Sequence, residues 1–146
     1  MAENLLKGKK GIIFGALNEM SIAWQVAEKA KEQGADLILT NAPIAMRMGE
    51  INTLAKKLDA PVIAADATRD DDLNALFEQS MTHFGGGVDF VLHSIGMSPN
   101  VRKGFPYTAS NHDFYLKTLD ISGLSLHRVL QAAYERDAIN EWGSVV

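Results

Sequence analysis

One turn near the start of the chain has the residue types of a phosphate-binding site. Gly15 ends the apolar run 11–14, and Ser21 lies where a helical pattern begins. Backbone N–H groups at the start of a helix lack partners within the helix, and the helix dipole attracts negative charge there. The turn therefore predicts a diphosphate-binding site, with Ser21 either capping the helix or donating to a phosphate. Alternatively, Gly15 only permits the turn and Ser21 only caps, because two residues are a weak signal.

Asp66 ends a second apolar run, which starts at Pro61. Its carboxylate could accept a hydrogen bond from an adenine amino group, while Ala67 supplies backbone groups. Asp is also common in turns, so Asp66 could instead shape the turn that leads into the next helix. The residue type therefore leaves a ligand contact and a structural role open.

The segment His93-Ser94-Ile95-Gly96 ends a third apolar run. Gly96 has no side chain, so a ligand could approach its backbone closely. His93 could be a catalyst, but a histidine in an apolar strand is more often a hydrogen-bonded packing residue. We predict ligand contact for Ile95 and Gly96, and a packing role for His93.

The residues after the run 36–40 leave the type of nicotinamide cofactor open. A typical NAD site has Asp or Glu there to bind the ribose hydroxyls, and this chain has neither. Either Asn41 and backbone groups hold the ribose, or Arg47 accepts a 2′-phosphate. NADH and NADPH both remain possible from these residues.

Short apolar runs alternate with amphipathic helical patterns along the whole chain. Nearly continuous hydrophobicity suits strands that are buried on both faces of a parallel sheet. The alternation predicts βαβ units and an α/β fold, a doubly wound parallel sheet of the Rossmann type with strand order 3-2-1-4-5. The expected strands are 11–15, 36–40, 61–66, 88–94 and a fifth from 143, and the expected helices are 21–33, 47–58, 68–84 and 111–138.

Ligands bind such sheets at the carboxyl ends of the strands, which all meet at one edge. Gly15, Asp66 and the segment 93–96 each follow a strand, so we expect them to share that edge. The fifth strand stops at Val146. We therefore expect residues 1–146 to form an incomplete dinucleotide-binding domain, the front portion of a longer protein.

Composition narrows the class of protein. The 146 residues suit one domain, and the net charge of −4 argues against non-specific binding to nucleic acid. The chain has no cysteine, which excludes disulfides and fits a reducing compartment. No apolar run approaches a membrane span, so we expect a soluble cytoplasmic protein. Asp70, Asp71 and Asp72 point in different directions on a helix, and we expect no metal site.

Four short stretches together resemble a known family: GALNEMSIA from Gly15, ADA from Ala65, HSIGM from His93 and DISGLS from Asp120. They are similar to the enoyl-(acyl-carrier-protein) reductases of bacterial fatty acid synthesis, divergent members of the short-chain dehydrogenase/reductase superfamily. The similarity covers essentially all 146 residues in order and spacing. That family replaces the glycine-rich turn with a Gly-x5-Ser-Ile-Ala pattern, so the resemblance implies that the turn after Gly15 is a nucleotide cradle.

The resemblance implies an NADH-dependent oxidoreductase, with NADPH still possible, that reduces the trans-2 double bond of an enoyl-acyl-carrier-protein thioester. It assigns Gly15, Ser21 and Ile22 to the pyrophosphate and nicotinamide end of the cofactor, and Asp66 and Ala67 to the adenine. The middle of the cofactor would contact Ser94, Ile95 and Gly96. Ser98 would contact the acyl substrate.

The family's catalytic tyrosine and lysine have no match within this sequence, so we expect no catalytic residue here and an inactive chain on its own. Relatives pair through helices like 111–138, which implies a homotetramer for the full-length protein. A different class, a non-catalytic dinucleotide-binding or partner-binding module, would also explain the missing residues. Titration with NADH and an assay with a crotonyl thioester test these two interpretations. Binding without turnover would support the module for this chain, but it would not identify the parent protein.

Overall fold

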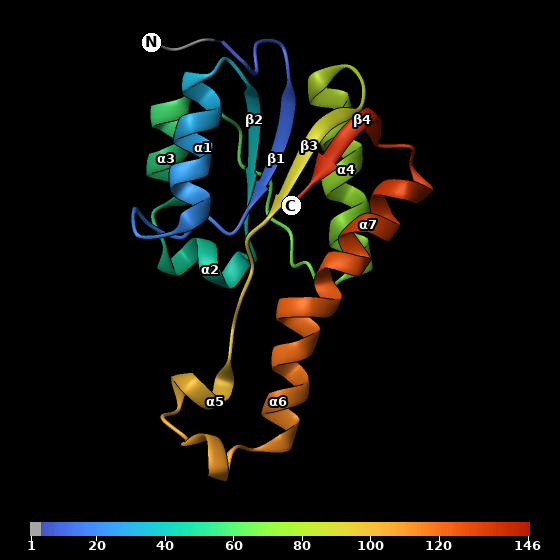
Figure 1. Ribbon diagram of the computed structural model, residues 1–146. Helices are drawn as coiled ribbons and strands as arrows, with labels where there is room; N and C mark the ends of the chain where they lie inside the picture. The colour runs from blue at the N-terminus through green and yellow to red at the C-terminus, as the bar shows by residue number, and fades with distance from the viewer. Residues whose placement is uncertain (1–3) are drawn as a thin grey trace.

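A parallel sheet of four strands forms the centre of the computed structural model, which describes residues 4–146 (Figure 1). The strands are β1 (Lys10–Phe14), β2 (Asp36–Thr40), β3 (Val88–His93) and β4 (Ile139–Val145), in the spatial order β2-β1-β3-β4. Residues 11–14 of β1 are buried, as the unbroken apolar run predicts for a strand covered on both faces.

Helices cover both faces of the sheet. Helices α1 (Ile22–Glu32) and α3 (Ile51–Leu58) lie on one face, and α4 (Asp70–Phe84) and α7 (Ser125–Glu135) lie on the other (Figure 1). Each face has its own apolar core, one including Trp24 of α1 and the other including Phe77 of α4. The predicted α/β fold, a doubly wound parallel sheet, is therefore confirmed.

The expected third strand is reduced to a single bridge. Val62 pairs in parallel with Leu39, so the segment lies beside β2 as the order 3-2-1-4-5 requires. The Ile63 amide donates to the Leu39 carbonyl and the Ala65 amide to the Asn41 carbonyl. Pro61 has no N–H to donate, and this limits the ladder to a few bonds at the edge.

The expected helix 47–58 is two helices, α2 (Pro43–Met48) and α3, separated at Gly49 and Glu50. A Cβ atom on Gly49 would lie 2.6 Å from the Leu17 carbonyl oxygen, and the Glu50 amide donates to that oxygen at 2.7 Å. Contact with the turn after β1 therefore interrupts a pattern that is helical by periodicity.

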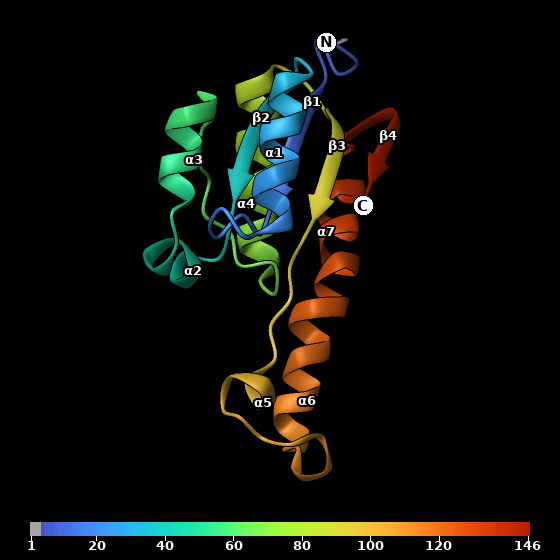
Figure 2. The same cartoon turned by 60° about the vertical axis from the view of Figure 1, so that its left-hand side comes forward.

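The expected helix 111–138 is also interrupted. It consists of α6 (His112–Leu119), a π-helical turn η2 (Asp120–Leu124) and α7. Two short elements precede it, α5 (Pro99–Arg102) and the 3-10 turn η1 (Tyr107–Ala109). Figures 1 and 2 show α5 and α6 extending beyond the carboxyl ends of the strands.

The last strand begins earlier than expected and is irregular. Ile139 pairs with Val88 and Ser144 pairs with Phe90, so β4 carries extra residues between these pairs. Trp142 lies in that insertion with a φ of 64° and is 96% exposed. Within residues 4–146, no helix combines the length and the apolar character needed to cross a membrane.

Candidate functional site

The ends of β1 and β3 meet very closely at the predicted edge. The Gly15 amide donates to the Thr40 carbonyl at 3.2 Å, which holds it against β2. Gly15 has a φ of +95°, and a Cβ atom there would lie 1.9 Å from the Ser94 carbonyl oxygen. Only glycine fits this position, so the structure brings Gly15 and Ser94 together as expected.

The turn after Gly15 is closed by a serine hydroxyl. The Ser21 Oγ accepts hydrogen bonds from the amides of Leu17 at 3.0 Å and Asn18 at 3.1 Å. Ser21 precedes α1, but its side chain does not cap the helix, so that part of the expectation was wrong. Two backbone amides of the turn therefore already donate their hydrogen bonds to a side chain of the protein itself.

Free backbone donors remain at the start of α1. The amides of Trp24 and Gln25 donate to the Ser21 carbonyl, whereas Ile22 and Ala23 occupy the first helical positions, which have no acceptor within a helix. Ile22 is 74% exposed, whereas Ala23 is fully buried. The first turn of α1 can therefore offer the Ile22 N–H group and the positive end of the helix dipole to an anion.

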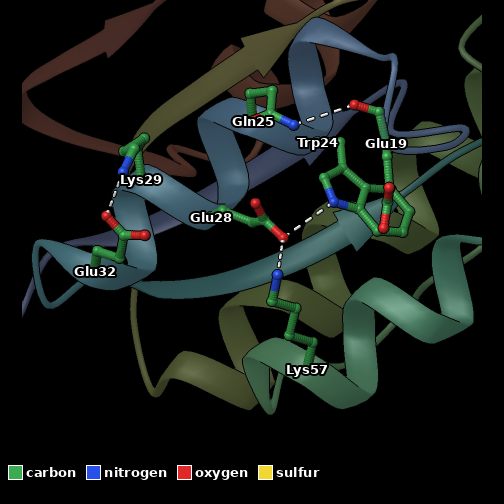
Figure 3. A network of polar contacts seen from close by, with 7 residues as sticks. All are labelled: Glu19, Trp24, Gln25, Glu28, Lys29, Glu32 and Lys57. Atoms are coloured by element: carbon green, nitrogen blue, oxygen red, sulfur yellow. Dashed lines mark hydrogen bonds and ion pairs between the residues drawn. The ribbon is translucent and has the colours of Figure 1, made fainter.

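The position of α1 is set by one buried side chain and a polar network. Trp24 is buried, and its Nε1 donates to the Glu28 carboxylate, which also accepts from Lys57 of α3 (Figure 3). The hydrogen bond from Lys57 is the main cause that lowers the pKa of Glu28. Gln25 donates to the Glu19 carbonyl, so the same helix also holds the turn (Figure 3).

Two groups support the turn from its other side. The Asn41 side chain donates to the Ala16 carbonyl at 3.4 Å, and the Glu50 amide donates to the Leu17 carbonyl at 2.7 Å. The sequence pattern contains no signal for the Glu50 contact, because it depends on the break between α2 and α3.

Asp66 shapes a local turn. Its Oδ1 accepts from both the amide and the hydroxyl of Thr68, and its amide donates to Asp72. Asp66 therefore shapes the turn that leads into α4, which was the alternative to a ligand contact. Its carboxylate can still accept further hydrogen bonds. Ala67 is 5% exposed and packs into the core that includes Phe77.

The site is elongated along the sheet edge. Ala65 is hydrogen-bonded beside Asn41, so the order across the edge is Asp66, Asn41, Gly15 and Ser94. Neighbouring strands are about 4.8 Å apart, so three intervals span roughly 14 Å. An edge of this length suits an extended ligand with separate contact points better than a single phosphate.

Gly96 has no structural reason to be glycine within the described chain. It is exposed, its φ lies outside the left-handed region, and a Cβ atom there would meet nothing within 4 Å. Ser98 lies just beyond, where its Oγ accepts weakly from the Val101 amide at 3.4 Å at the start of α5. Open space at Gly96, next to the strand end, is consistent with a ligand that occupies it.

An apolar groove of about 830 Å³ begins beside the turn and runs along the sheet face between α1 and β4. Ser21 and Ile22 line it, together with Phe90 and Leu92 of β3. The other predicted residues do not line this groove: Gly15, 66–67, 94–96 and Ser98. The structure therefore places the predicted residues along an edge that joins the groove at Ser21 and Ile22.

His93 has the packing role predicted for it. Its Nε2 lies 2.8 Å from the buried Ser125 Oγ, which itself donates to the Ile121 carbonyl at 2.6 Å. Since the serine proton is used in that bond, the histidine donates from Nε2 and its neutral form satisfies the contact. Burial lowers the pKa of His93 from its ordinary value of 6.5.

The lowered pKa of His93 predicts a pH-dependent stability. In the unfolded chain the His93 ring takes up a proton near pH 6.5, whereas in the folded chain it does so only at lower pH. The contribution of neutral His93 to the free energy of unfolding is therefore fully present above pH 6.5 and is lost as the pH falls below that value. His93→Gln is expected to remove this loss between about pH 7 and pH 5 in urea unfolding. Parallel pH profiles for the two proteins would contradict the assignment of this pH dependence to His93.

Glu28 and Asp89 have lowered pKa values, so their contributions to the free energy of unfolding disappear only at more acidic pH.

Comparison with known proteins identifies the family. A family profile described as "Enoyl-(Acyl carrier protein) reductase" matches residues 15–146. The curated relative enoyl-(acyl-carrier-protein) reductase (NADH) 1 from Rhizobium meliloti is 32% identical, over 99% of this chain and 52% of the relative. The corresponding FabI protein from Rickettsia conorii is also 32% identical, over 100% of this chain and 55% of the relative. The chain thus spans about half the length of the curated relatives it matches.

Solved structures agree with this match. The FabI–NADH complex from Alistipes finegoldii superposes with a TM-score of 0.95 and is 58% identical, over 97% of this chain and 50% of that chain. The reductase from Anaplasma phagocytophilum in complex with NAD has a TM-score of 0.83 at 25% identity, over 97% of this chain and 53% of that one. Because the profile covers nearly the whole sequence, the chain belongs to the enoyl-(acyl carrier protein) reductase family.

Proposed function

We propose that this chain binds NADH along the edge formed by Asp66, Gly15 and Ser94. The observation that carries the proposal is the contrast between two glycines of this edge. Gly15 must be glycine because its φ is +95° and the Ser94 carbonyl oxygen lies against it, whereas the chain's own backbone and packing do not require glycine at Gly96, two residues after Ser94. The first turn of α1 follows Gly15 and Ser21 directly along the chain, and its Ile22 N–H group and positive dipole end would suit the diphosphate. The relatives named above as NADH enzymes, and the FabI–NADH complex, support the same cofactor.

In the proposed arrangement each residue has a distinct part. Gly15, Ser21 and Ile22 would line the diphosphate and nicotinamide end, with Ser21 acting by shaping the turn. Asp66 and Ala67 would contact adenine, and Ser94, Ile95 and Gly96 the middle of the cofactor. Ser98 would lie beside the acyl substrate.

We propose reduction of the trans-2 double bond of an enoyl-acyl-carrier-protein for the whole protein to which this chain corresponds. Bound NADH supplies the hydride, and this chain's residues bind and orient it. No residue within 1–146 matches the family's tyrosine and lysine, so the chain alone is expected to bind the cofactor without turnover.

Titration of the purified chain with NADH and NADPH, followed by fluorescence, tests the cofactor proposal. We expect saturable binding with preference for NADH, and no oxidation of NADH after addition of a crotonyl thioester. Failure to bind either nucleotide would contradict the proposal. Binding without turnover is also what a non-catalytic module predicts for this chain, so turnover by the chain alone would exclude that alternative.

We also propose that the full-length protein is a homotetramer in the cytoplasm. Apolar side chains are exposed on α6 and α7, including Leu116 at 64% and Tyr134 at 88%, and they offer a surface for self-association. The absence of cysteine fits a reducing compartment. Sedimentation that shows only monomers of the full-length protein would count against the assembly.

A further inference from the structure

The segment between β3 and α5 borders the proposed nucleotide site but has no regular structure. Residues 94–98 belong to neither a strand nor a helix, and Figure 1 shows them as a single extended connection. Their backbone position cannot come from a sheet ladder or a helix. It must be held by contacts with other parts of the chain.

One side chain holds both backbone groups of Met97. The Ser122 Oγ accepts from the Met97 amide at 3.0 Å and donates to the Met97 carbonyl at 3.3 Å. The two residues are 25 positions apart, and the bonds are partly buried. Met97 directly follows Gly96, so this contact restrains the backbone at the point where the cofactor is proposed to approach.

Ser122 belongs to the π-helical turn η2, and a second serine near it holds the other end of the same segment. Ser125 contacts the ring of His93, while Ser122 contacts Met97. The turn is itself anchored, because Arg128 pairs with Asp120 at 3.7 Å and with Asp70 of α4 at 3.1 Å. π-helical turns are rare and frequently occur at functional sites.

We propose that Ser122 is a positioning residue of the nucleotide site, which fixes the backbone of Gly96 and Met97 through its hydroxyl. This inference rests on the proposed function. Ser122 itself touches only Met97 among the residues of this segment, so it acts on the cofactor through the backbone that it holds.

Ser122→Ala and Ser122→Thr test the proposal in the 146-residue chain. Hydrogen exchange of the Met97 amide is expected to accelerate about fivefold to tenfold in Ser122→Ala, the factor for one lost hydrogen bond. NADH affinity is expected to fall by at least about fivefold. Ser122→Thr keeps the hydroxyl and should restore both values, which loss of packing alone would not predict.

Thr82→Ala is the matched control, because the Thr82 hydroxyl donates to the Glu78 carbonyl within α4, away from the site. It should leave NADH affinity unchanged, because the hydroxyl bond that it removes lies within α4. Unchanged exchange at Met97 in Ser122→Ala, or equal loss of NADH affinity in Thr82→Ala, would overturn the inference. If the unmodified chain does not bind NADH, the proposed function fails, and the exchange comparison still decides whether Ser122 holds the segment.

Discussion

Gly15→Ala is expected to lower the free energy of unfolding by about 3 kcal/mol. The backbone at Gly15 has a φ of +95°, which an L side chain rarely adopts. In addition, the new Cβ atom would lie 1.9 Å from the Ser94 carbonyl oxygen, a backbone atom that cannot turn aside. Relief of the clash requires the ends of β1 and β3 to separate. Urea unfolding followed by circular dichroism measures the change.

The control for this substitution is Gly86→Ala. Gly86 follows α4, has a φ outside the left-handed region and has nothing within 4 Å of a built Cβ atom. Its substitution should change the free energy of unfolding by no more than about 0.5 kcal/mol. If Gly15→Ala is equally mild, the close approach of Gly15 and Ser94 is not a feature of the folded protein.

Gly96→Val, unlike Gly15→Ala, is expected to leave the stability of the fold unchanged. It should reduce NADH affinity at least about tenfold, which corresponds to about 1.4 kcal/mol of binding free energy. A Cβ atom at Gly96 would have no atom of the chain within 4 Å, and the residue is exposed, so the change in unfolding free energy should stay within about 0.5 kcal/mol. The valine would nevertheless occupy the space beside the strand end that the cofactor is proposed to fill. Calorimetric titration with NADH measures the loss.

Gly86→Val serves as the control for binding, because it adds the same side chain at another open glycine. NADH affinity should match that of the unmodified chain in this variant. Full NADH affinity in Gly96→Val would mean that no ligand lies against Gly96, and it would remove the main observation behind the cofactor proposal.

Three of the strands and the order of the sheet followed from the sequence pattern, whereas the segment 61–66 forms only a bridge and β4 begins before residue 143. The expected strand 36–40 is β2. The expected run 11–15 is shifted by one residue at each end from β1, and the run 88–94 is one residue longer than β3. Apolar runs of this kind are informative because a parallel strand is buried on both faces whatever its neighbours are. The shared edge of Gly15 and Ser94 followed from the same pattern, since carboxyl ends of parallel strands must meet.

The role of Ser21 was not predictable from the same pattern. Its residue type and position agree with a helix cap, yet its hydroxyl binds the amides of Leu17 and Asn18. The path of the turn decides between these bonds, and Glu50 and Asn41 hold that turn from distant parts of the chain. Hydrogen-bond partners of a short polar side chain therefore depend on tertiary contacts.

Periodicity and residue type, which are local properties, were enough for the α/β class, the strand order, the glycine at the end of β1 and the packing role of His93. The interruption of helix 111–138 and the contact of Ser122 with Met97 emerged only in the folded chain. The physical reason is that a single π-turn of five residues changes the spacing of apolar residues too little to stand out within a long helical pattern. The groups that contact this part of the helix, Met97 with Ser122 and Asp70 with Arg128, come from segments that are 25 or more residues away in the sequence.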